Sequence, residues 1–528
     1  MDERHQVTQA GFAAAVGRHA PEAEFDVIVC GAGSAGSTVA GMLAADEDLR
    51  VLLLEAGPDD ADERVSDPDR WFENFGSERD WGFVTEPGRH IDQRRLPYSM
   101  GKGLGGGSSI NVGVWSRGHR RDWDDLAASS RDPRWDYRST LGVYRELETW
   151  NGTADPDRRG STGPIHVRPA QPLHPFFVAM LEGAESVGLD RFDSPNGELA
   201  ERGSGCAVRD EIVEGGTRLS PYRALVAPRC AQANLTVLTH TSVTRVLFEG
   251  KRAVGVEAVA QGRVIRFRAA REVVLSLGAV QTPKLLMHSG AGPAGHLEAL
   301  GIGVLEDLPG VGANLDDHLL VGAVWEAGAR ELPPPPRAQA VCFWGSDGRA
   351  ESPQFVMYSG ASAFMSPEAQ ARYGSPESAF TFLLGMRLRS RGSVRLADTD
   401  PTGPPVIETG YFDDPDDLRD AVEGYRFAQA IADTKAMRPY RGPGVIPGHA
   451  SDAEVAAYIR AAAGTFWHPC GTARIGIDRH AVVDSELRVR GLERLRVADA
   501  SVLPRVTSGN TMAPCVVVGH RAATLIRG

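Results

Sequence analysis

The sequence lacks the long apolar runs and the leader pattern that would mark a membrane or secreted protein. No stretch approaches the roughly eighteen consecutive apolar residues of a membrane helix. Residues 1–24 are polar and acidic, without the basic start and apolar run of a signal peptide. We therefore expect a cytoplasmic protein with no membrane span and a short N-terminal arm over residues 1–24.

Paired cysteines and an excess of positive charge are also missing. The six cysteines are scattered and form no Cys-x-x-Cys pair, so we expect reduced thiols and no metal site. The net charge is −12, which argues against nucleic acid or an anionic membrane as a partner. A local run of alternating arginines is better explained by a solvated strand than by a basic funnel: Arg387, Arg389, Arg391 and Arg395.

What the sequence does contain, near its start, is a strand–turn–helix–strand pattern. Residues 25–30 and 50–55 are apolar and β-branched and predict buried strands, with a helix over 39–45 between them. The turn reads Gly31-Ala-Gly33-Ser-Ala-Gly36. In this context its glycines permit a tight turn, a close approach to pyrophosphate and close helix–strand packing. The pattern predicts a dinucleotide site rather than a ligand-free turn.

An acidic residue closes the second strand of this unit. Glu55 lies nineteen residues after Gly36, where a carboxylate suits a free ribose 2′-hydroxyl and repels a 2′-phosphate. We therefore expect an unphosphorylated adenosine. The pattern alone does not separate FAD from NAD.

The rest of the chain predicts alternating strands and helices with no internal repeat. Thr282-Pro283 has the pattern of a helix start. Residues 59–70 are polar and acidic and predict a loop. The proline run 331–337 is either a linker or a lid. The other expected strands are 235–238, 243–248, 254–259, 264–267, 272–277 and 406–407, and the other expected helices are 416–432 and 452–463.

Further motifs follow in order along the chain. They are Met100-Gly-Lys-Gly-Leu-Gly-Gly-Gly-Ser-Ser-Ile-Asn111, Gly278 to Gly292, Trp467-His-Pro-Cys-Gly-Thr, Leu495 to Ser501 and Gly509-Asn-Thr-Met-Ala-Pro514. Together with the first glycine turn, they resemble the glucose–methanol–choline (GMC) oxidoreductase family over residues 25–526. Ala291 is a minor departure, because the family usually has a branched aliphatic residue there.

The resemblance implies an α/β protein (α+β overall) with a Rossmann-type FAD-binding domain and a sheet-and-helix substrate-binding cap. The FAD domain is expected to be discontinuous, over 25–160, 205–315 and 460–528, and the cap to comprise 161–204 and 316–459. The residues expected to contact FAD are Gly31, Gly33, Ser34, Ala35, Gly36, Glu55, Gly103, Gly106, Ser108, Asn111, Val243, Gly278, Asp499, Ala500 and Thr511.

Elementary chemistry supports a flavin. Five glycines between 101 and 109 let backbone lie against a planar ring and offer N–H donors. Pro514 stands where a first helical turn would begin, before the apolar helix 515–526. The positive end of that helix would stabilise the negative charge of a reduced flavin by up to about 2 kcal/mol.

The implied reaction is oxidation of an alcohol to an aldehyde or ketone, with hydride passing to flavin N5. The resemblance makes His468 the acceptor of the hydroxyl proton, a task that suits the ordinary pKa of histidine. Asn510 would bond the substrate oxygen, although it could also cap the following helix. We expect His288, His318 and His520 to be structural. The alternatives are a lyase of the hydroxynitrile-lyase type with a non-redox flavin, and a protein that only binds FAD.

Two departures from choline-oxidising relatives narrow the substrate and the flavin linkage. Ile110 replaces a histidine that bonds FAD covalently, so FAD should be noncovalent. Leu320 replaces a carboxylate that meets quaternary ammonium, which disfavours choline. Phe466 and Trp467 beside His468 suggest a neutral primary or aromatic-type alcohol, and plain packing is an equal alternative for these two aromatic residues. The electron acceptor, oxygen or a quinone or carrier, and the oligomeric state, monomer or homodimer, stay open.

Overall fold

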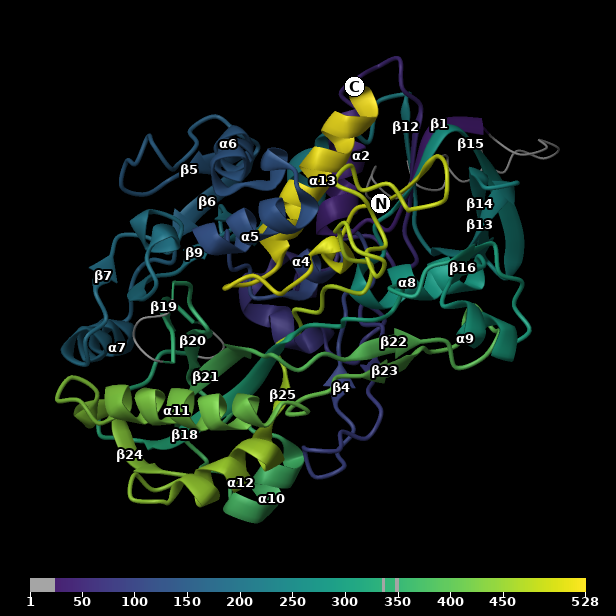
Figure 1. The fold of residues 1–528 in the computed structure, drawn as a ribbon. Coiled ribbons are helices and arrows are strands. Elements are labelled where there is room, and N and C mark those ends of the chain that lie inside the picture. The colour runs from purple at the N-terminus through teal and green to yellow at the C-terminus, as the bar shows by residue number, and fades with distance from the viewer. Residues whose placement is uncertain (1–23, 335–337, 347–350) are drawn as a thin grey trace.

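The computed structural model describes residues 24–334, 338–346 and 351–528. The expected N-terminal arm, apart from residue 24, and the last three residues of the proline run lie outside these ranges. Residues 331–334 have no regular secondary structure. Two large sheets dominate the fold, one in the upper half of Figure 1 and one in the lower half.

The first sheet has the strand order β12-β2-β1-β15-β14-β13, and β26 also pairs with β15. Strands β12, β2, β1, β15 and β26 run parallel, whereas β13, β14 and β15 form an antiparallel meander. Both strands of the predicted first unit are confirmed. The bounds are β1 (Glu24–Cys30), β2 (Val51–Leu54), β12 (Leu235–Leu238), β13 (Thr241–Glu249), β14 (Arg252–Ala260), β15 (Arg263–Leu275) and β26 (Leu495–Val497).

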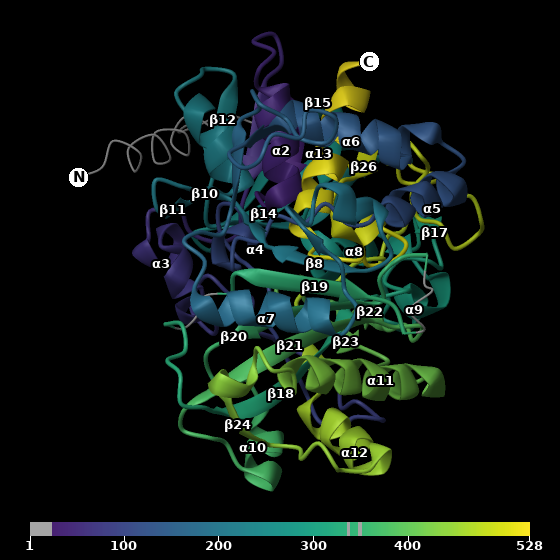
Figure 2. The ribbon, with the colours of Figure 1, turned by 90° about the vertical axis from the view of Figure 1, so that its left-hand side faces the viewer.

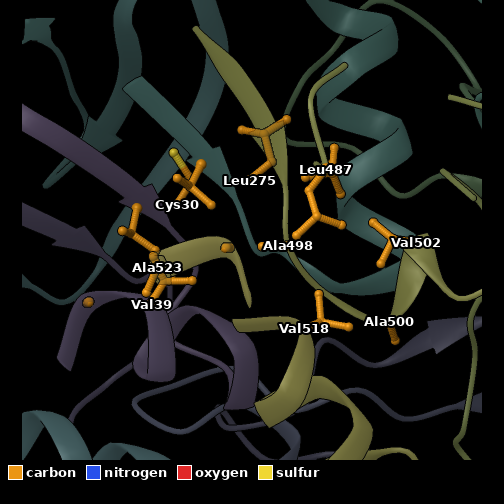
Figure 3. Close-up of a cluster of buried hydrophobic side chains, with 14 of the residues drawn as sticks. Cys30, Val39, Leu275, Leu487, Ala498, Ala500, Val502, Val518 and Ala523 are labelled. Atoms are coloured by element: carbon orange, nitrogen blue, oxygen red, sulfur yellow. The ribbon is translucent and has the colours of Figure 1, made fainter. Parts of the chain in front are cut away.

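Two helices from opposite ends of the sequence pack together beside this sheet. They are α2 (Ser34–Leu43) and α13 (Met512–Arg527), which lie side by side in Figures 1 and 2. A Cβ at Gly519 would come within 2.4 Å of the Ala35 carbonyl oxygen, so only glycine allows this contact. Figure 3 shows buried apolar side chains of this region, among them Cys30 of β1, Val39 of α2 and Val518 of α13.

The second sheet has the order β24-β18-β21-β20-β19-β8-β7, with β25 paired to β18. Helices cover one face over a large apolar core, with α7 and α11 in front of the strands in Figure 2. The other face carries a smaller cluster around Leu320, Tyr358 and Phe466. The bounds are β7 (Arg191–Phe192), β8 (Gly205–Val208), β18 (His318–Ala327), β19 (Ala340–Trp344), β20 (Phe355–Gly360), β21 (Ala379–Arg387), β24 (Arg441–Gly444), β25 (Gly464–Thr465), α7 (Pro175–Ser186), α10 (Pro367–Tyr373), α11 (Pro415–Ala432) and α12 (Asp452–Ala462).

Smaller elements connect the two sheets. They are α3 (Glu63–Ser66), β3 (Phe83–Val84), β4 (Pro97–Tyr98), α4 (Gly107–Ile110), α5 (Arg120–Ser130), α6 (Tyr137–Leu147), β5 (Glu148–Trp150), β6 (Ile165–Pro169), β9 (Asp210–Glu211), β10 (Val213–Glu214), β11 (Thr217–Arg218), α8 (Gly278–His288), β16 (Ala291–Gly292), α9 (Ala294–Ala299), β17 (Glu306–Asp307), β22 (Ser393–Arg395) and β23 (Val406–Glu408). None of the helices in the described ranges has the length and apolar surface that crossing a bilayer requires.

Several sequence predictions need correction. The expected loop 59–70 contains α3 and the start of a 3-10 helix (Pro68–Asn74), whose first turns are capped by the side chains of Asp62 and Asp67. The strands expected at 264–267 and 272–277 are one strand, β15. The arginine run is not simply solvated, because Arg387 is buried and pairs with Asp122 at 3.1 Å.

Helix α8 begins at Gly278 and not at the predicted Thr282-Pro283. Pro283 lies inside the helix, where it cannot donate the backbone bond that the Ala279 carbonyl oxygen would normally accept. The Thr472 hydroxyl donates to that oxygen instead, at 2.6 Å. A side chain distant in the sequence therefore makes the interior proline tolerable.

Candidate functional site

One cavity joins the first glycine turn to the second sheet. Its wall begins at Gly31 and Gly33, passes the glycine loop around Gly106, and ends at His468 and Asn510. The cavity thus has two ends of different composition. We call the part around Gly31–Gly33 and Glu55 the glycine end, and the part around His468, Asn510 and Tyr358 the histidine end.

The glycine end is shaped by residues that have no side chain. Gly31 adopts φ +95°, in the region that favours glycine. A Cβ at Gly36 would lie 1.9 Å from the Gly31 carbonyl oxygen, so this turn excludes any larger residue. Gly33, which precedes α2, has open space where a Cβ would project. This arrangement fits a pyrophosphate placed at the N-terminus of a helix.

Glu55 ties the glycine segments together. Its Oε2 accepts the backbone N–H of Ala32, and its Oε1 accepts those of Gly57 and Gly103, each at 2.9 Å. Burial raises the pKa of Glu55, whereas these N–H donors act to lower it. The carboxylate also lines the cavity, where the sequence places a ribose hydroxyl.

The remaining residues expected at FAD divide into two groups. Those that line the cavity are Ser34, Ala35, Gly106, Ser108, Asn111, Gly278, Asp499, Ala500 and Thr511. Gly36, Gly103 and Val243 do not line it. Gly36 supports the turn from behind, Gly103 donates its N–H to Glu55, and Val243 is half-buried on β13.

Asp499 organises the backbone at the cavity wall. Its Oδ2 accepts the Gly278 N–H at 2.9 Å and the Thr282 hydroxyl at 2.6 Å, and its Oδ1 accepts from Ser501. Burial raises its pKa, against these hydrogen bonds. Asp499 therefore holds the start of α8 against the last segment of the chain.

At the histidine end, the two expected catalytic side chains meet. Asn510 Nδ2 lies 2.9 Å from His468 Nε2, and the Tyr358 hydroxyl donates to Asn510 Oδ1 at 2.6 Å. Because an amide N–H only donates, Nε2 of His468 accepts this bond and is unprotonated. Burial lowers the pKa of His468 to about 3, so the ring is neutral and can take a proton.

Asn510 does not cap the last helix. The N-cap of α13 is Thr511, which makes no side-chain capping bond, and the helix begins at Met512. The capping alternative is therefore wrong. Thr511 and Met512 both line the cavity, so the positive end of a sixteen-residue helix faces it, as expected from Pro514.

His318, for which the sequence suggested a structural role, contacts His468 directly. Its Nδ1 lies 2.9 Å from His468 Nδ1, and its backbone oxygen accepts the N–H of Phe466. With Nε2 of His468 unprotonated, Nδ1 carries the proton and donates it to His318. Burial, and then the charge of a protonated His468, lower the pKa of His318, which keeps this acceptor neutral.

Sequence reasoning also missed Asp317, which positions the catalytic segment. Its Oδ1 accepts the backbone N–H of His468 at 2.9 Å, and its Oδ2 accepts hydroxyls from Tyr98, Tyr411 and Thr465. Burial raises the pKa of Asp317 to about 6. The consecutive Asp316-Asp-His318 was the available signal, because charged residues at the start of an apolar strand need a reason to be buried.

Aromatic and aliphatic side chains line the rest of the histidine end. Trp467 adopts φ +58°, which is uncommon for a large residue. The centroid of its ring lies 5.1 Å from that of Phe75 and 6.3 Å from that of Phe364. Leu320 and Phe466 also line the wall. Within the described ranges, the only carboxylates on the cavity wall are Glu55 and Asp499, and both accept hydrogen bonds from backbone N–H groups.

All six cysteines are free thiols, and four of them are buried. Within the part of the chain that the structure describes, no group of three or more His, Cys, Asp or Glu side chains could hold a metal ion.

Comparison with known proteins points in one direction. The N-terminal family model of the GMC oxidoreductases matches residues 25–320, and the C-terminal model matches residues 389–519. A protein of Paraburkholderia xenovorans named oxygen-dependent choline dehydrogenase is 36% identical over 96% of this chain and 94% of its own length. A protein of Pseudomonas fluorescens with the same name is also 36% identical, with the same coverage.

Solved structures agree with these relatives. Pyridoxine 4-oxidase from Mesorbium loti has a TM-score of 0.89 and 31% identity, covering 95% of this chain and 98% of its own. A formate oxidase of Aspergillus oryzae RIB40 has a TM-score of 0.87 and 25% identity, covering 96% of this chain and 99% of its own. The formate oxidase structure concerns the effect of a mutation on FAD modification in that enzyme.

Proposed function

The chain belongs to the GMC oxidoreductase family, whose members bind FAD and act on CH–OH donors, and we propose that its substrate is a neutral primary or aromatic-type alcohol. The observation that supports this substrate class most is the wall of the histidine end. Aromatic and aliphatic side chains line the cavity around His468. In the described ranges no carboxylate lines this end, and Asp317, which accepts the His468 N–H, lies behind the wall. A cationic substrate would lose water there without gaining a counter-charge.

The proposed chemistry assigns each side chain one task. Bound FAD supplies the acceptor for the hydride that leaves the carbinol carbon. His468 takes the hydroxyl proton on Nε2, the atom that faces Asn510. Asn510 orients the alcohol oxygen and is itself fixed by Tyr358. His318 accepts the Nδ1–H of His468 and so holds the tautomer in which Nε2 is free.

Choline is the sharpest competing substrate, because aromatic faces attract cations and the curated relatives carry choline in their names. We expect benzyl alcohol to bleach the flavin faster than choline under anaerobic conditions. Leu320→Glu should improve reduction by choline, whereas Leu320→Gln, its uncharged match, should not. Equal or faster reduction by choline in the unmodified enzyme contradicts the proposed substrate class.

The same anaerobic experiment separates oxidation from the lyase alternative. A lyase retains oxidised flavin with every alcohol, whereas an oxidoreductase is bleached by its substrate. Admitting air and then a quinone to the reduced enzyme identifies the electron acceptor.

We also propose that FAD is bound noncovalently in a discontinuous domain formed by 25–160, 205–315 and 460–528, with 161–204 and 316–459 as the cap. Two edges of these ranges need adjustment, because β8 and β25 belong to the second sheet. Ile110 lines the cavity and offers no nucleophile for a covalent bond. Acid precipitation should therefore release free FAD into the supernatant. Flavin that remains in the pellet contradicts this linkage.

A further inference from the structure

Two arginines hold consecutive carbonyl groups behind the cavity wall. Arg209 Nη1 donates to the Val112 carbonyl oxygen at 3.0 Å. Arg218 Nη1 donates to the Asn111 carbonyl oxygen and, at 3.1 Å, to Asn111 Oδ1. Asn111 and Val112 both line the cavity, directly after α4. The two guanidinium groups therefore support the same piece of wall from behind.

The two arginines differ in how their charge is balanced. Arg209 pairs with Glu211 at 2.9 Å, and both are buried. Arg218 is 1% exposed and has no carboxylate within 4.0 Å in the described ranges. Its Nε donates to the Val65 carbonyl oxygen at 2.9 Å, and its Nη2 has no hydrogen-bond partner in the part of the chain that is described. Burying a charge without a counter-ion is costly, so it calls for an explanation.

Arg218 remains a cation despite this burial. Burial, and then the charges of Arg223 and Arg209, lower its pKa to about 9, whereas Asp67 and Asp69, beyond contact distance, act to raise it. Arg218 is therefore protonated at neutral pH. Asn111 separates it from the histidine end. Asn111 Nδ2 lies 3.4 Å from Met512 Sδ, two residues after Asn510. The unbalanced charge is thus one residue behind the wall at which the alcohol is proposed to react.

We propose that Arg218 raises the reduction potential of bound FAD by stabilising the charge that the cofactor gains. Hydride transfer breaks the carbinol C–H bond and delivers two electrons and one proton, so the cofactor gains one negative charge while the hydroxyl proton goes to His468. A fixed cation in a site of low dielectric favours this product. Arg218 does not line the cavity, so its charge acts on the cofactor from behind Asn111. The inference rests on the proposed function only in placing the flavin ring at the histidine end.

The first test measures the midpoint potential of bound FAD by chemical reduction against a reference dye, without any alcohol. We expect Arg218→Met to lower the midpoint potential by at least about 30 mV. For a two-electron couple, this shift lowers the ratio of reduced to oxidised flavin at a fixed potential about tenfold. Arg218→Lys, which keeps the charge, should remain within threefold of the unmodified enzyme. Arg209→Met is the matched control, because it removes a side chain that donates to a carbonyl oxygen and whose charge is paired with Glu211. Its ratio of reduced to oxidised flavin should also remain within threefold of that of the unmodified enzyme.

A second pair of variants keeps Arg218 in place, in case Arg218→Met does not fold. Gly113 has φ +69°, and a Cβ there would have only Arg218 Nη1 within 4 Å, at 4.0 Å. Aspartate and asparagine both tolerate this backbone conformation. Gly113→Asp should balance the charge of Arg218 and lower the potential as Arg218→Met does. Gly113→Asn, equal in size and uncharged, should not.

Three results would overturn the proposal. The first is an unchanged potential in Arg218→Met. The second is an equal fall of the potential in Arg209→Met, which would assign the effect to the lost contact with a carbonyl group. The third is equal potentials in Gly113→Asp and Gly113→Asn. Because the flavin is reduced chemically, these results do not depend on the substrate. An enzyme that no alcohol reduces, but whose potential follows the charge of residue 218, would contradict the proposed function and support this inference.

Discussion

The two ends of the cavity are built by opposite means. At the glycine end, the shape depends on missing side chains, since a Cβ at Gly36 would collide with the backbone of Gly31. At the histidine end, it depends on large side chains that contact each other, such as Trp467 and Phe75. Backbone recognition requires glycine at fixed spacings, whereas an apolar wall can be formed by many residues. The cofactor is therefore readable from sequence motifs, and the substrate is not.

The largest expected effect is at the glycine end. Gly36→Val should abolish nearly all FAD binding, because its Cβ would be 1.9 Å from the Gly31 carbonyl oxygen and the turn would have to open. Gly142→Ala is the control, since a Cβ there meets nothing within 4 Å. FAD per chain, measured by absorbance after purification, checks both. Full FAD content in Gly36→Val would show that this end tolerates side chains after all.

At the histidine end, removing the base should affect chemistry and leave the cofactor bound. His468→Ala should slow anaerobic flavin reduction roughly 10²–10⁴-fold, the usual effect of losing a positioned base. FAD content should persist, because the residues of the glycine end are unchanged. Stopped-flow reduction with equal FAD loading measures it. An unchanged rate would remove His468 as the base.

Asn510→Ala should have a smaller effect. Losing one hydrogen bond to a charged oxygen costs about 1.5–3 kcal/mol, or roughly 10- to 150-fold in rate. Tyr358→Phe, which only releases Asn510 Oδ1, should lower the rate less. The same stopped-flow experiment ranks the three variants. A larger defect in Asn510→Ala than in His468→Ala would reverse the assignment.

His318→Phe should slow reduction by about tenfold, the value of one hydrogen bond, because it removes the acceptor that fixes the His468 tautomer. His318→Asn can still offer an oxygen to Nδ1 and should recover part of the rate. If both variants behave like the unmodified enzyme, His318 is structural, as the sequence suggested.

The smallest effect is expected from pH. Burial lowers the pKa of His468 to about 3, and a base acts only when unprotonated, so activity should be lost only as pH falls toward that value. From pH 8 to pH 5, protonation of His468 itself should change the flavin reduction rate by less than about twofold. A smaller fall centred near pH 6 would report Asp317, whose pKa is about 6. A histidine at its ordinary pKa of about 6.5 would lose roughly 30-fold over this range. A thirtyfold fall would mean that the base is solvated.

The sequence predicted those parts of the fold that depend on local residue patterns. The first strand–turn–helix–strand unit, α11 and α12 follow from apolar spacing and capping residues, and the structure confirms them. The start of α8 could not be predicted, because a hydroxyl from Thr472 compensates for Pro283. The role of His318 was missed for the same reason. Its partner lies 150 residues away, and the pairing of β18 with β25 and of Asp316 with Cys470 brings them together.

The packing of α13 on α2 also affects the order of events during synthesis of the chain. About 470 residues separate the end of α2 from the start of α13. At 5–20 residues per second, a ribosome needs on the order of half a minute to a minute and a half to make that stretch. During this interval the glycine turn of the nascent chain lacks both its helical neighbour and the wall at Thr511 and Met512. We therefore expect lasting capture of FAD only after α13 has been synthesised, so flavin starvation should leave an apoprotein that includes α13.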